Sequence, residues 1–307
     1  MTIAVIIPTF RREAQVKRLV TTLFEGGRSP DEVIIVDNDP AASCHASWPS
    51  GWPVRIVCAG LGLNLAGARN RGWRLTDADL CVFIDDDNFV APNTLEVLNK
   101  GASGLNVGLV APIIYETGRP SRVWCGGVRR SMWTTRTHFL HRGSVELPDA
   151  KSWSTDDMPD VLAIPRKVLE EVAGFDEVHF PFHYDEADIA ERIRRLGLQS
   201  IVLRDASVWH SGGPDTDPGI EMFRAFEISG SPRVQFMAYA RAYFHRRHAT
   251  RTQRITALGL FIPVWALMVA VACMRQRKPI GQKRDVILAI LVGLIRGYTR
   301  KVPGRRL

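Results

Sequence analysis

Cysteine is scarce in this sequence, and no two cysteines have the spacing of a zinc or redox motif. The 307-residue chain has five cysteines and no C-x-x-C pair. An odd number without such pairs argues against a disulfide framework and a zinc site, and fits a reducing compartment. We therefore expect the cysteines to be buried and to pack as small apolar side chains, at positions Cys44, Cys58, Cys81, Cys125 and Cys273.

The N-terminus has no pattern typical of a secretory leader. Its apolar run, Ile3–Ile7, is too short for the hydrophobic region of a signal peptide. Pro8 and the basic pair Arg11-Arg12 follow the run at once. We therefore expect the part of the chain that carries the chemistry to stay in the cytosol.

Acidic residues are nearly missing from the C-terminal part of the chain. From Arg241 to Leu307 there are 15 lysines and arginines but one acidic residue, Asp285, which leaves 25 basic and 31 acidic residues before Arg241. The first part therefore has a net charge of −6 and the tail one of +14. Such asymmetry indicates that the tail meets an anionic partner.

An uncharged run, Ile255–Met274, lies within this basic tail. Its 20 residues would form a helix about 30 Å long, which matches a bilayer core. The later apolar run, Val286–Ile295, is too short to cross, and both flanks of the long run are basic, so the positive-inside rule gives no orientation. Two geometries remain open: a true span, or two helices held in the cytoplasmic interface by anionic lipids. The apolar run favours lipid over nucleic acid as the anionic partner.

The first 210 residues alternate between short β-branched runs and amphipathic segments. This alternation predicts an α/β fold with a mainly parallel sheet, whose ligands bind beyond the carboxyl ends of the strands. Two acidic clusters, Asp37–Asp39 and Asp85–Asp87, follow predicted strands and should meet in one crevice. Residues 115–160 read as loops. We expect strands at Thr2–Ile7, Glu32–Val36, Val54–Val57, Leu80–Ile84 and Ser200–Leu203, and helices at Glu13–Phe24, Ala66–Leu75, Arg166–Val172 and Asp185–Leu196.

The triplet Asp85-Asp86-Asp87 concentrates negative charge at the end of one predicted strand. Adjacent carboxylates raise one another's cost of ionisation, so a cation is needed to compensate them. Hard oxygen ligands select Mg²⁺ or Mn²⁺, ions that also bridge phosphate oxygens. The alternative is a solvated acidic turn or a cap for a helix over Pro92–Lys100.

Several motifs together resemble the family 2 glycosyltransferases, over about residues 2–213 and in the expected order. This resemblance implies a GT-A fold, which is Rossmann-like with a mainly parallel central sheet. The tail is also similar to that of the rhamnosyl- and galactofuranosyltransferase-like branch. The matching segments are Ile6–Arg12, Val36–Asn38, Asn64–Gly72, Phe83–Asn88, Gly174–Glu177, Tyr184–Asp188 and Trp209-His210.

The resemblance implies roles for individual residues. Asp85 and Asp87 would hold Mn²⁺ or Mg²⁺ with His210, although a satisfied loop histidine is an equal reading of His210. Glu186 is the candidate catalytic base and Asp185 the alternative, while both could merely cap a helix. Asp188 and Trp209 would contact the acceptor. The nucleotide-sugar donor would meet Pro8, Thr9, Arg11, Asp37, Asn64, Arg69 and Asp86.

Two departures from the family pattern leave the acceptor and the choice of catalytic base open. The acidic pair reads Asp185-Glu186 where Glu-Asp is common, and Val161–Ile164 stands where Gly-Ala is frequent. Neither change touches the donor motifs.

The expected protein is an inverting, metal-dependent glycosyltransferase. It would move a sugar from a UDP- or dTDP-sugar to a saccharide or lipid-linked acceptor in cell-surface polysaccharide synthesis, at the cytoplasmic face of the membrane. We expect a catalytic domain over 1–240, with a donor half to about 115 and an acceptor half from 116, and a membrane-associating region over 241–307. The rival readings are a nucleotidyltransferase of similar fold and a non-catalytic nucleotide-sugar-binding protein.

Overall fold

The computed structural model describes residues 1–39, 48–60, 62–211 and 218–301, and Cys44 lies outside them. Cys81, Cys125 and Cys273 are buried as expected, whereas the expectation is wrong for Cys58, which is exposed because it ends the edge strand Val54–Cys58. The chain forms two compact units. The first comprises Met1–Arg129 and His138–Gly213, and the second Arg130–Thr137 and Pro214–Leu307. The predicted domain boundary at 240 falls inside a helix of the second unit, because the charge changes at Arg241 while the packing does not.

A ten-stranded mixed sheet forms the centre of the first unit, with the order β10-β12-β6-β11-β4-β1-β2-β3. Strand β1 pairs in parallel with β2 and β4, β2 with β3, and β6 with β12. Strand β11 lies between β4 and β6 and pairs with both in antiparallel orientation. Strand β5 pairs with β12, and β7 with β6. The strands are β1 Ile3–Thr9, β2 Glu32–Asp37, β3 Val54–Cys58, β4 Leu80–Ile84, β5 Asn88–Val90, β6 Val107–Glu116, β7 Arg119–Cys125, β10 Ser152–Ser154, β11 Val161–Pro165 and β12 Gln199–His210.

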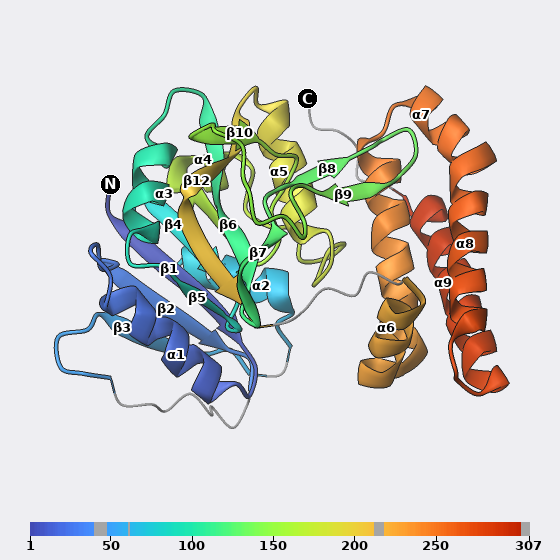
Figure 1. Ribbon diagram of the computed structural model, residues 1–307, viewed down its shortest axis with the longest axis horizontal. Coiled ribbons are helices and arrows are strands. Elements are labelled where there is room, and N and C mark those ends of the chain that lie inside the picture. Colours follow the sequence, from blue (N-terminus) through green and yellow to red (C-terminus); the bar gives the residue numbers. More distant parts are fainter. Residues whose placement is uncertain (40–47, 61, 212–217, 302–307) are drawn as a thin grey trace. The chain divides into compact units, whose positions relative to one another are not determined.

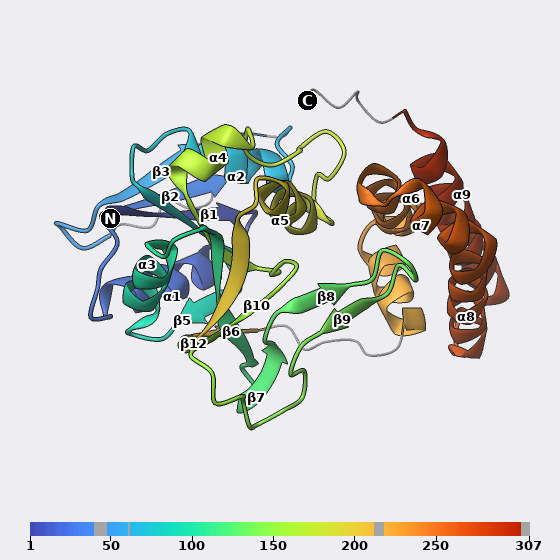
Figure 2. The ribbon, with the colours of Figure 1, turned by 90° about the horizontal axis from the view of Figure 1, so that it is seen from above.

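Helices cover both faces of this sheet (Figures 1 and 2). Between their end residues, strands β1, β2 and β4 are apolar because both of their faces are buried, as expected of parallel strands. One core cluster joins the sheet to α1 and α3, and another joins it to α2, α4 and α5. The bounds are α1 Glu13–Phe24, α2 Leu65–Trp73, α3 Thr94–Ala102, α4 Arg166–Glu171 and α5 Asp185–Arg195.

The predicted α/β class with a mainly parallel central sheet is confirmed. The prediction of loops over 115–160 is wrong in part, because this stretch contains β7, β10 and the two-stranded sheet of β8 (Val128–Arg130) and β9 (Thr137–Phe139). Strand β7 carries Arg119, Pro120 and Arg122, so it lacks the apolar alternation that signals a strand. The antiparallel pairing with β6 holds this segment as a strand, and the sequence pattern does not reveal that pairing.

The second unit is helical. Helix α6 (Pro218–His248) contains a kink at Ser229 and Gly230, and then come α7 (Arg251–Thr256), a π-helical segment (Ala257–Phe261), α8 (Ile262–Arg275) and α9 (Ile280–Thr299). Apolar residues of α6, α8 and α9 share one core cluster. Among the described residues, one helical stretch, Arg251–Arg275, is long and apolar enough to cross a membrane by length and composition.

Two glycines let α9 approach α6 closely. A Cβ at Gly297 would lie 2.6 Å from the Tyr239 carbonyl oxygen and 2.6 Å from Ala242 Cβ, and one at Gly293 would meet the Gln235 carbonyl oxygen. Small residues at such spacing allow helix backbones to touch. The Gly293–Gly297 segment therefore fixes how α9 packs on α6.

We expect Gly297→Ala to destabilise the protein by about 1–3 kcal/mol, because the added methyl would overpack against backbone. Gly281→Ala, on the same helix, is the matched control, since a Cβ there meets nothing within 4 Å. That variant should gain about 0.5–1 kcal/mol from the lower backbone entropy of the unfolded chain. Thermal unfolding of both proteins measures the difference, and equal melting temperatures would contradict the packing argument.

Candidate active site

Acidic and hydroxyl side chains gather where β1 and β4 end. Thr9, the last residue of β1, donates from Oγ1 to Asp86 Oδ2 at 2.6 Å. Asp85 follows β4 directly, and its N–H donates to the carbonyl oxygen of Asp160 at 3.0 Å. Parallel pairing of β1 with β4 brings these strand ends to one edge of the sheet, as the sequence predicts.

The Arg69 side chain is the hub of this edge. It extends from α2, has no exposed surface, and contacts carboxylates from two distant parts of the chain. Its Nη2 donates to Asp85 Oδ1 at 2.7 Å, while Nη1 donates to Asp185 Oδ2 at 2.6 Å and Glu186 Oε1 at 2.7 Å. Three carboxylates around one guanidinium leave the cluster with a net negative charge. The predicted diphosphate contact by Arg69 stays a prediction, and in this structure the guanidinium binds carboxylates.

The two acids that begin α5 differ in exposure. The Asp185 side chain is fully buried, whereas that of Glu186 is 16% exposed. Burial, followed by the charge of Glu186, raises the pKa of Asp185 well above its ordinary value. Burial would also raise the pKa of Glu186, but the charge of Arg69 and hydrogen bonds outweigh it and lower that pKa. Glu186 is therefore the more accessible member of the pair and the one whose pKa is lowered.

His210, at the end of β12, faces two carboxylates. Its Nδ1 lies 3.5 Å from Asp87 Oδ1 and 3.6 Å from Asp160 Oδ2. Burial lowers the pKa of His210, yet these carboxylates outweigh it and raise that pKa, and His210 in turn outweighs burial to lower the pKa of Asp87. The Trp124 ring lies 4.8 Å from the imidazole, centroid to centroid. The structure thus brings Asp87 and His210 together, as the sequence predicts.

Asp160 is a site residue that the sequence analysis does not identify. It precedes β11, whose antiparallel pairing with β4 sets it beside Asp85. Its φ of 63° is uncommon for a residue with a side chain and is best tolerated by Asn and Asp. Burial raises its pKa to about 8, with His210 opposing the shift and Asp85 adding to it. A Pro-Asp pair before an apolar run is the one signal that the sequence offers.

Arg12 is a second residue without a predicted role. Its Nη1 donates to Asp86 Oδ1 at 2.9 Å and to Asp87 Oδ2 at 3.3 Å. About half of its side chain is exposed, so it reaches the acidic cluster from the solvent side. A half-exposed guanidinium beside these carboxylates is well placed to contact a phosphate as well.

The acidic cluster fits a divalent cation by its chemistry. Burial raises the pKa of Asp85 to about 6, with the negative charges of Glu186 and Asp87 adding to the shift and Arg69 opposing it. Within the part of the chain that the structure describes, Asp160 Oδ2 and His210 Nδ1 are buried without a hydrogen-bond partner. Carboxylate oxygens and an imidazole nitrogen suit Mn²⁺ or Mg²⁺. Among the same residues, no group of three or more His, Cys, Asp or Glu is already drawn together as a ligand set.

The other predicted donor contacts lie around the ends of β1 and β2. Pro8 is buried in β1, and Asp37, the fully buried last residue of β2, accepts a hydrogen bond from the Asp39 N–H at 2.9 Å. Arg11 donates from Nε to Asp39 at 3.0 Å. Asn64 caps α2 by accepting from the Gly67 N–H at 2.8 Å. Their predicted contacts with a nucleotide remain predictions.

The two predicted acceptor contacts are held by neighbouring side chains. Asp188 is buried, and its Oδ2 accepts from Arg192 Nε at 2.7 Å on the same helix. Trp209 stacks on Phe89 and Tyr115, and its indole N–H donates to the Pro120 carbonyl oxygen at 3.1 Å. These contacts fix the orientation of both side chains, and a contact with an acceptor stays a prediction.

We expect Asp160→Asn to become more stable relative to the wild type as pH rises from 5 to 8. The wild-type carboxyl has a pKa of about 8 when folded and an ordinary acidic pKa when unfolded, so the folded protein loses stability as pH rises through this window. Asn does not titrate and accepts the positive φ. The difference should grow by no more than about 1.4 kcal/mol per pH unit.

The measurement for this variant is thermal unfolding in chelator at several pH values. Asp149→Asn is the control, because the Asp149 side chain is fully exposed. A stability difference between Asp160→Asn and the wild type that does not change with pH would show that the carboxyl is ionised throughout.

Comparisons with known proteins agree with this geometry. The family model described as "Glycosyl transferase family 2" matches residues 4–172. Galactofuranosyltransferase GlfT1 from Mycolicibacterium smegmatis is 25% identical over 69% of this chain and 72% of its own length. An uncharacterised glycosyltransferase from Haemophilus influenzae is 30% identical, but that match spans only 31% of this chain and 32% of the relative.

The fold is also shared with a solved structure. GalNAc-T7, crystallised with UDP, GalNAc and Mn²⁺, superposes with a TM-score of 0.59 at 14% identity, over 80% of this chain and 50% of that protein. At this identity the likeness shows the fold, which is the GT-A arrangement expected from the sequence. The family match covers more than half of the chain and confirms the predicted enzyme class. This chain belongs to glycosyl transferase family 2.

Proposed function

We propose that the protein is an inverting, metal-dependent glycosyltransferase that moves a sugar from a UDP- or dTDP-sugar to a hydroxyl group of a saccharide or lipid-linked acceptor. The observation that carries this proposal is the Arg69 hub. Its guanidinium joins Asp85, from the predicted metal motif, to Asp185 and Glu186, from the predicted acceptor motif. A donor held at Asp85 would therefore lie next to a carboxylate able to accept a proton.

On the donor side, the acidic cluster would hold Mn²⁺ or Mg²⁺ through Asp85, Asp87 and His210. When bound, such an ion stabilises the negative charge that develops on the departing nucleotide diphosphate. GalNAc-T7 is crystallised with Mn²⁺ and UDP, which supports this assignment. Thr9 and Arg12 orient the Asp86 carboxylate from both of its oxygens, and so shape the edge of the site.

On the acceptor side, Glu186 would take the proton from the attacking hydroxyl group. Its Oε1 is oriented by Arg69, and its side chain is partly exposed, so an acceptor can reach it. Asp185 is fully enclosed and would serve to fix Arg69. A direct attack of this kind would invert the anomeric centre.

The likeness to galactofuranosyltransferase GlfT1 supports transfer of a sugar, and the proposal adds a saccharide acceptor and a role in cell-surface polysaccharide synthesis. The apolar helical stretch Arg251–Arg275 supports a place at a membrane, where a lipid-linked acceptor would be found, and the proposal puts the protein at the cytoplasmic face. Both assignments belong to the proposal.

The test is a donor screen with the purified chain. Each UDP- and dTDP-sugar is incubated with saccharide acceptors, and released nucleotide diphosphate is measured with Mn²⁺ and with chelator. We expect release that chelation abolishes and Mn²⁺ restores. Activity that is unchanged by chelation would remove the metal assignment. Release of pyrophosphate would favour a nucleotidyltransferase, and donor binding without turnover would favour a binding protein.

A further inference from the structure

The outer face of α8 and α9 exposes many apolar side chains. On α8 they recur at helical spacing, and Leu267 and Met268 are 66% and 65% exposed. Ile295 on α9 is 63% exposed. Further exposed residues are Val264, Val271 and Met274 on α8, and Leu288, Leu291 and Val292 on α9. An apolar surface of this extent marks a site of interaction.

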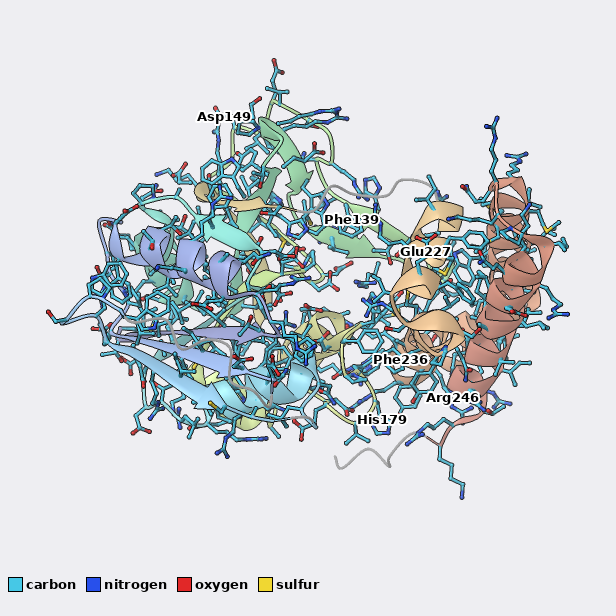
Figure 3. The ribbon with its side chains drawn as sticks, turned by 90° about the horizontal axis from the view of Figure 1, so that it is seen from below. Phe139, Asp149, His179, Glu227, Phe236 and Arg246 are labelled. Atoms are coloured by element: carbon cyan, nitrogen blue, oxygen red, sulfur yellow. The ribbon has the colours of Figure 1, made fainter. Side chains whose placement is uncertain are left out.

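The inner face of the same helices packs on α6 along its length. At one end, Lys278 in the α8–α9 turn pairs with Glu227 of α6. In the middle, the Arg241 guanidinium lies 4.4 Å from the centroid of the Trp265 ring on α8. At the other end, the Tyr298 hydroxyl hydrogen-bonds His245 Nδ1 at 2.7 Å. Figure 3 labels Glu227 and Arg246, which lie on opposite sides of the kink in α6.

This packing decides how α8 can meet a membrane. If α8 crossed a bilayer, α6 would have to enter with it or separate from it. Helix α6 carries Arg233 and Arg241 at the level of the shared core, and burial of each charge at the centre of a bilayer is strongly unfavourable. Separation would expose the core formed by Val234, Ala238 and Ala242 with α8 and α9. Neither step is compatible with the structure.

Cations surround the apolar face. Arg251, Arg275, Arg277, Arg284, Arg300 and Lys301 are exposed, and Asp285 is the one acidic residue between 251 and 301. Arginine and lysine at the margin of an apolar helix face reach lipid headgroups while their stems stay with the apolar surface. A second copy of the chain would place the same cations against one another, which disfavours a symmetric dimer through this face.

We propose that the outer face of α8 and α9 docks onto an anionic lipid bilayer, with both helices lying in the plane of the interface and α6 on the water side. This inference selects between the span and the interfacial pair that the sequence leaves open. It does not depend on the transfer reaction.

The first test is flotation of the full chain with vesicles of phosphatidylcholine, with and without phosphatidylglycerol. We expect binding to the anionic vesicles that weakens with salt. Leu267→Glu with Met268→Glu should reduce the affinity at least tenfold. Leu105→Glu is the control, because Leu105 is 94% exposed in the first unit and should leave binding unchanged.

A second variant guards against misfolding of the first. Arg275→Gln with Arg277→Gln changes two exposed cations and no core residue, and should weaken binding to anionic vesicles about fivefold for each cation removed. Donor turnover with a soluble acceptor is measured on every variant. Vesicle binding without turnover would refute the proposed function alone, and turnover without vesicle binding would refute the docking surface alone.

The last test separates the in-plane geometry from a span. Gln276→Cys places a thiol in the α8–α9 turn, in a background with Cys44→Ser and Cys58→Ser, because Cys58 is exposed and Cys44 lies outside the described residues. The protein is added to sealed vesicles and treated with an impermeant maleimide. Immediate labelling is expected for in-plane helices. Labelling only after detergent would show that α8 crosses, and a stable dimer without lipid binding would show that a second copy covers the face. Either result overturns the proposal.

Discussion

Replacing Arg69 with methionine is expected to remove transferase activity and a large share of the folding free energy. The side chain is fully buried and is the shared partner of Asp85, Asp185 and Glu186. Loss of one member of a buried ionic cluster typically costs roughly 3–5 kcal/mol, because the remaining charges are left uncompensated. Total stabilities are only about 5–15 kcal/mol. Unfolding in denaturant and turnover of the donor measure the two effects.

Arg71→Met is the matched control for this prediction. Arg71 lies on the same helix and in the same motif, but its side chain is exposed. The same change there should be nearly neutral for stability. Arg69→Lys should also fail, because one ammonium group cannot meet carboxylates on both edges of a planar guanidinium.

The deficit of Arg69→Met should shrink at acidic pH. Without the guanidinium, the pKa values of the three carboxyl groups rise, and protonation then relieves their repulsion. Equal stability of Arg69→Met and Arg71→Met at neutral pH would show that the hub contributes little to the fold.

Sequence patterns predicted the strands of the first unit well because those strands are buried on both faces. The expected strand over Leu80–Ile84 coincides with β4, and the expected helix over Glu13–Phe24 with α1. Each strand end then carries its motif to the same edge. This is why the sequence predicts one crevice for the clusters Asp37–Asp39 and Asp85–Asp87, whereas His210 joins that prediction only through the resemblance to the family.

The sequence does not predict which polar side chains are buried or which distant strands pair. Helix α2 is rich in Ala and Gly and is buried around most of its surface, so its pattern does not reveal which way Arg69 points. Asp160 is separated from Asp85 by 75 positions, and only the antiparallel pairing of β11 with β4 brings them together. The change in charge at Arg241 is likewise a change in composition alone, because helix α6 continues across this position without a break in packing.

Replacing Glu186 with glutamine is expected to lower kcat by about 10²- to 10⁴-fold, the usual contribution of a general base. The amide has the same shape, and its oxygen can still accept the hydrogen bond from Arg69 Nη1. Donor KM and thermal stability should therefore change little. Steady-state kinetics with a chosen donor and acceptor measure the effect, and Glu171→Gln, at an exposed position of α4, is the control.

Asp185→Asn distinguishes the two candidate bases. Asp185 has no exposed surface, so it cannot reach an acceptor, and burial and the charge of Glu186 raise its pKa. Its replacement should disturb stability more than kcat, whereas Glu186→Gln should do the reverse. Because Arg69 helps to lower the pKa of Glu186, wild-type activity should persist as pH falls until that lowered pKa is reached. Full activity of Glu186→Gln together with loss of kcat in Asp185→Asn would assign the proton transfer to Asp185 instead.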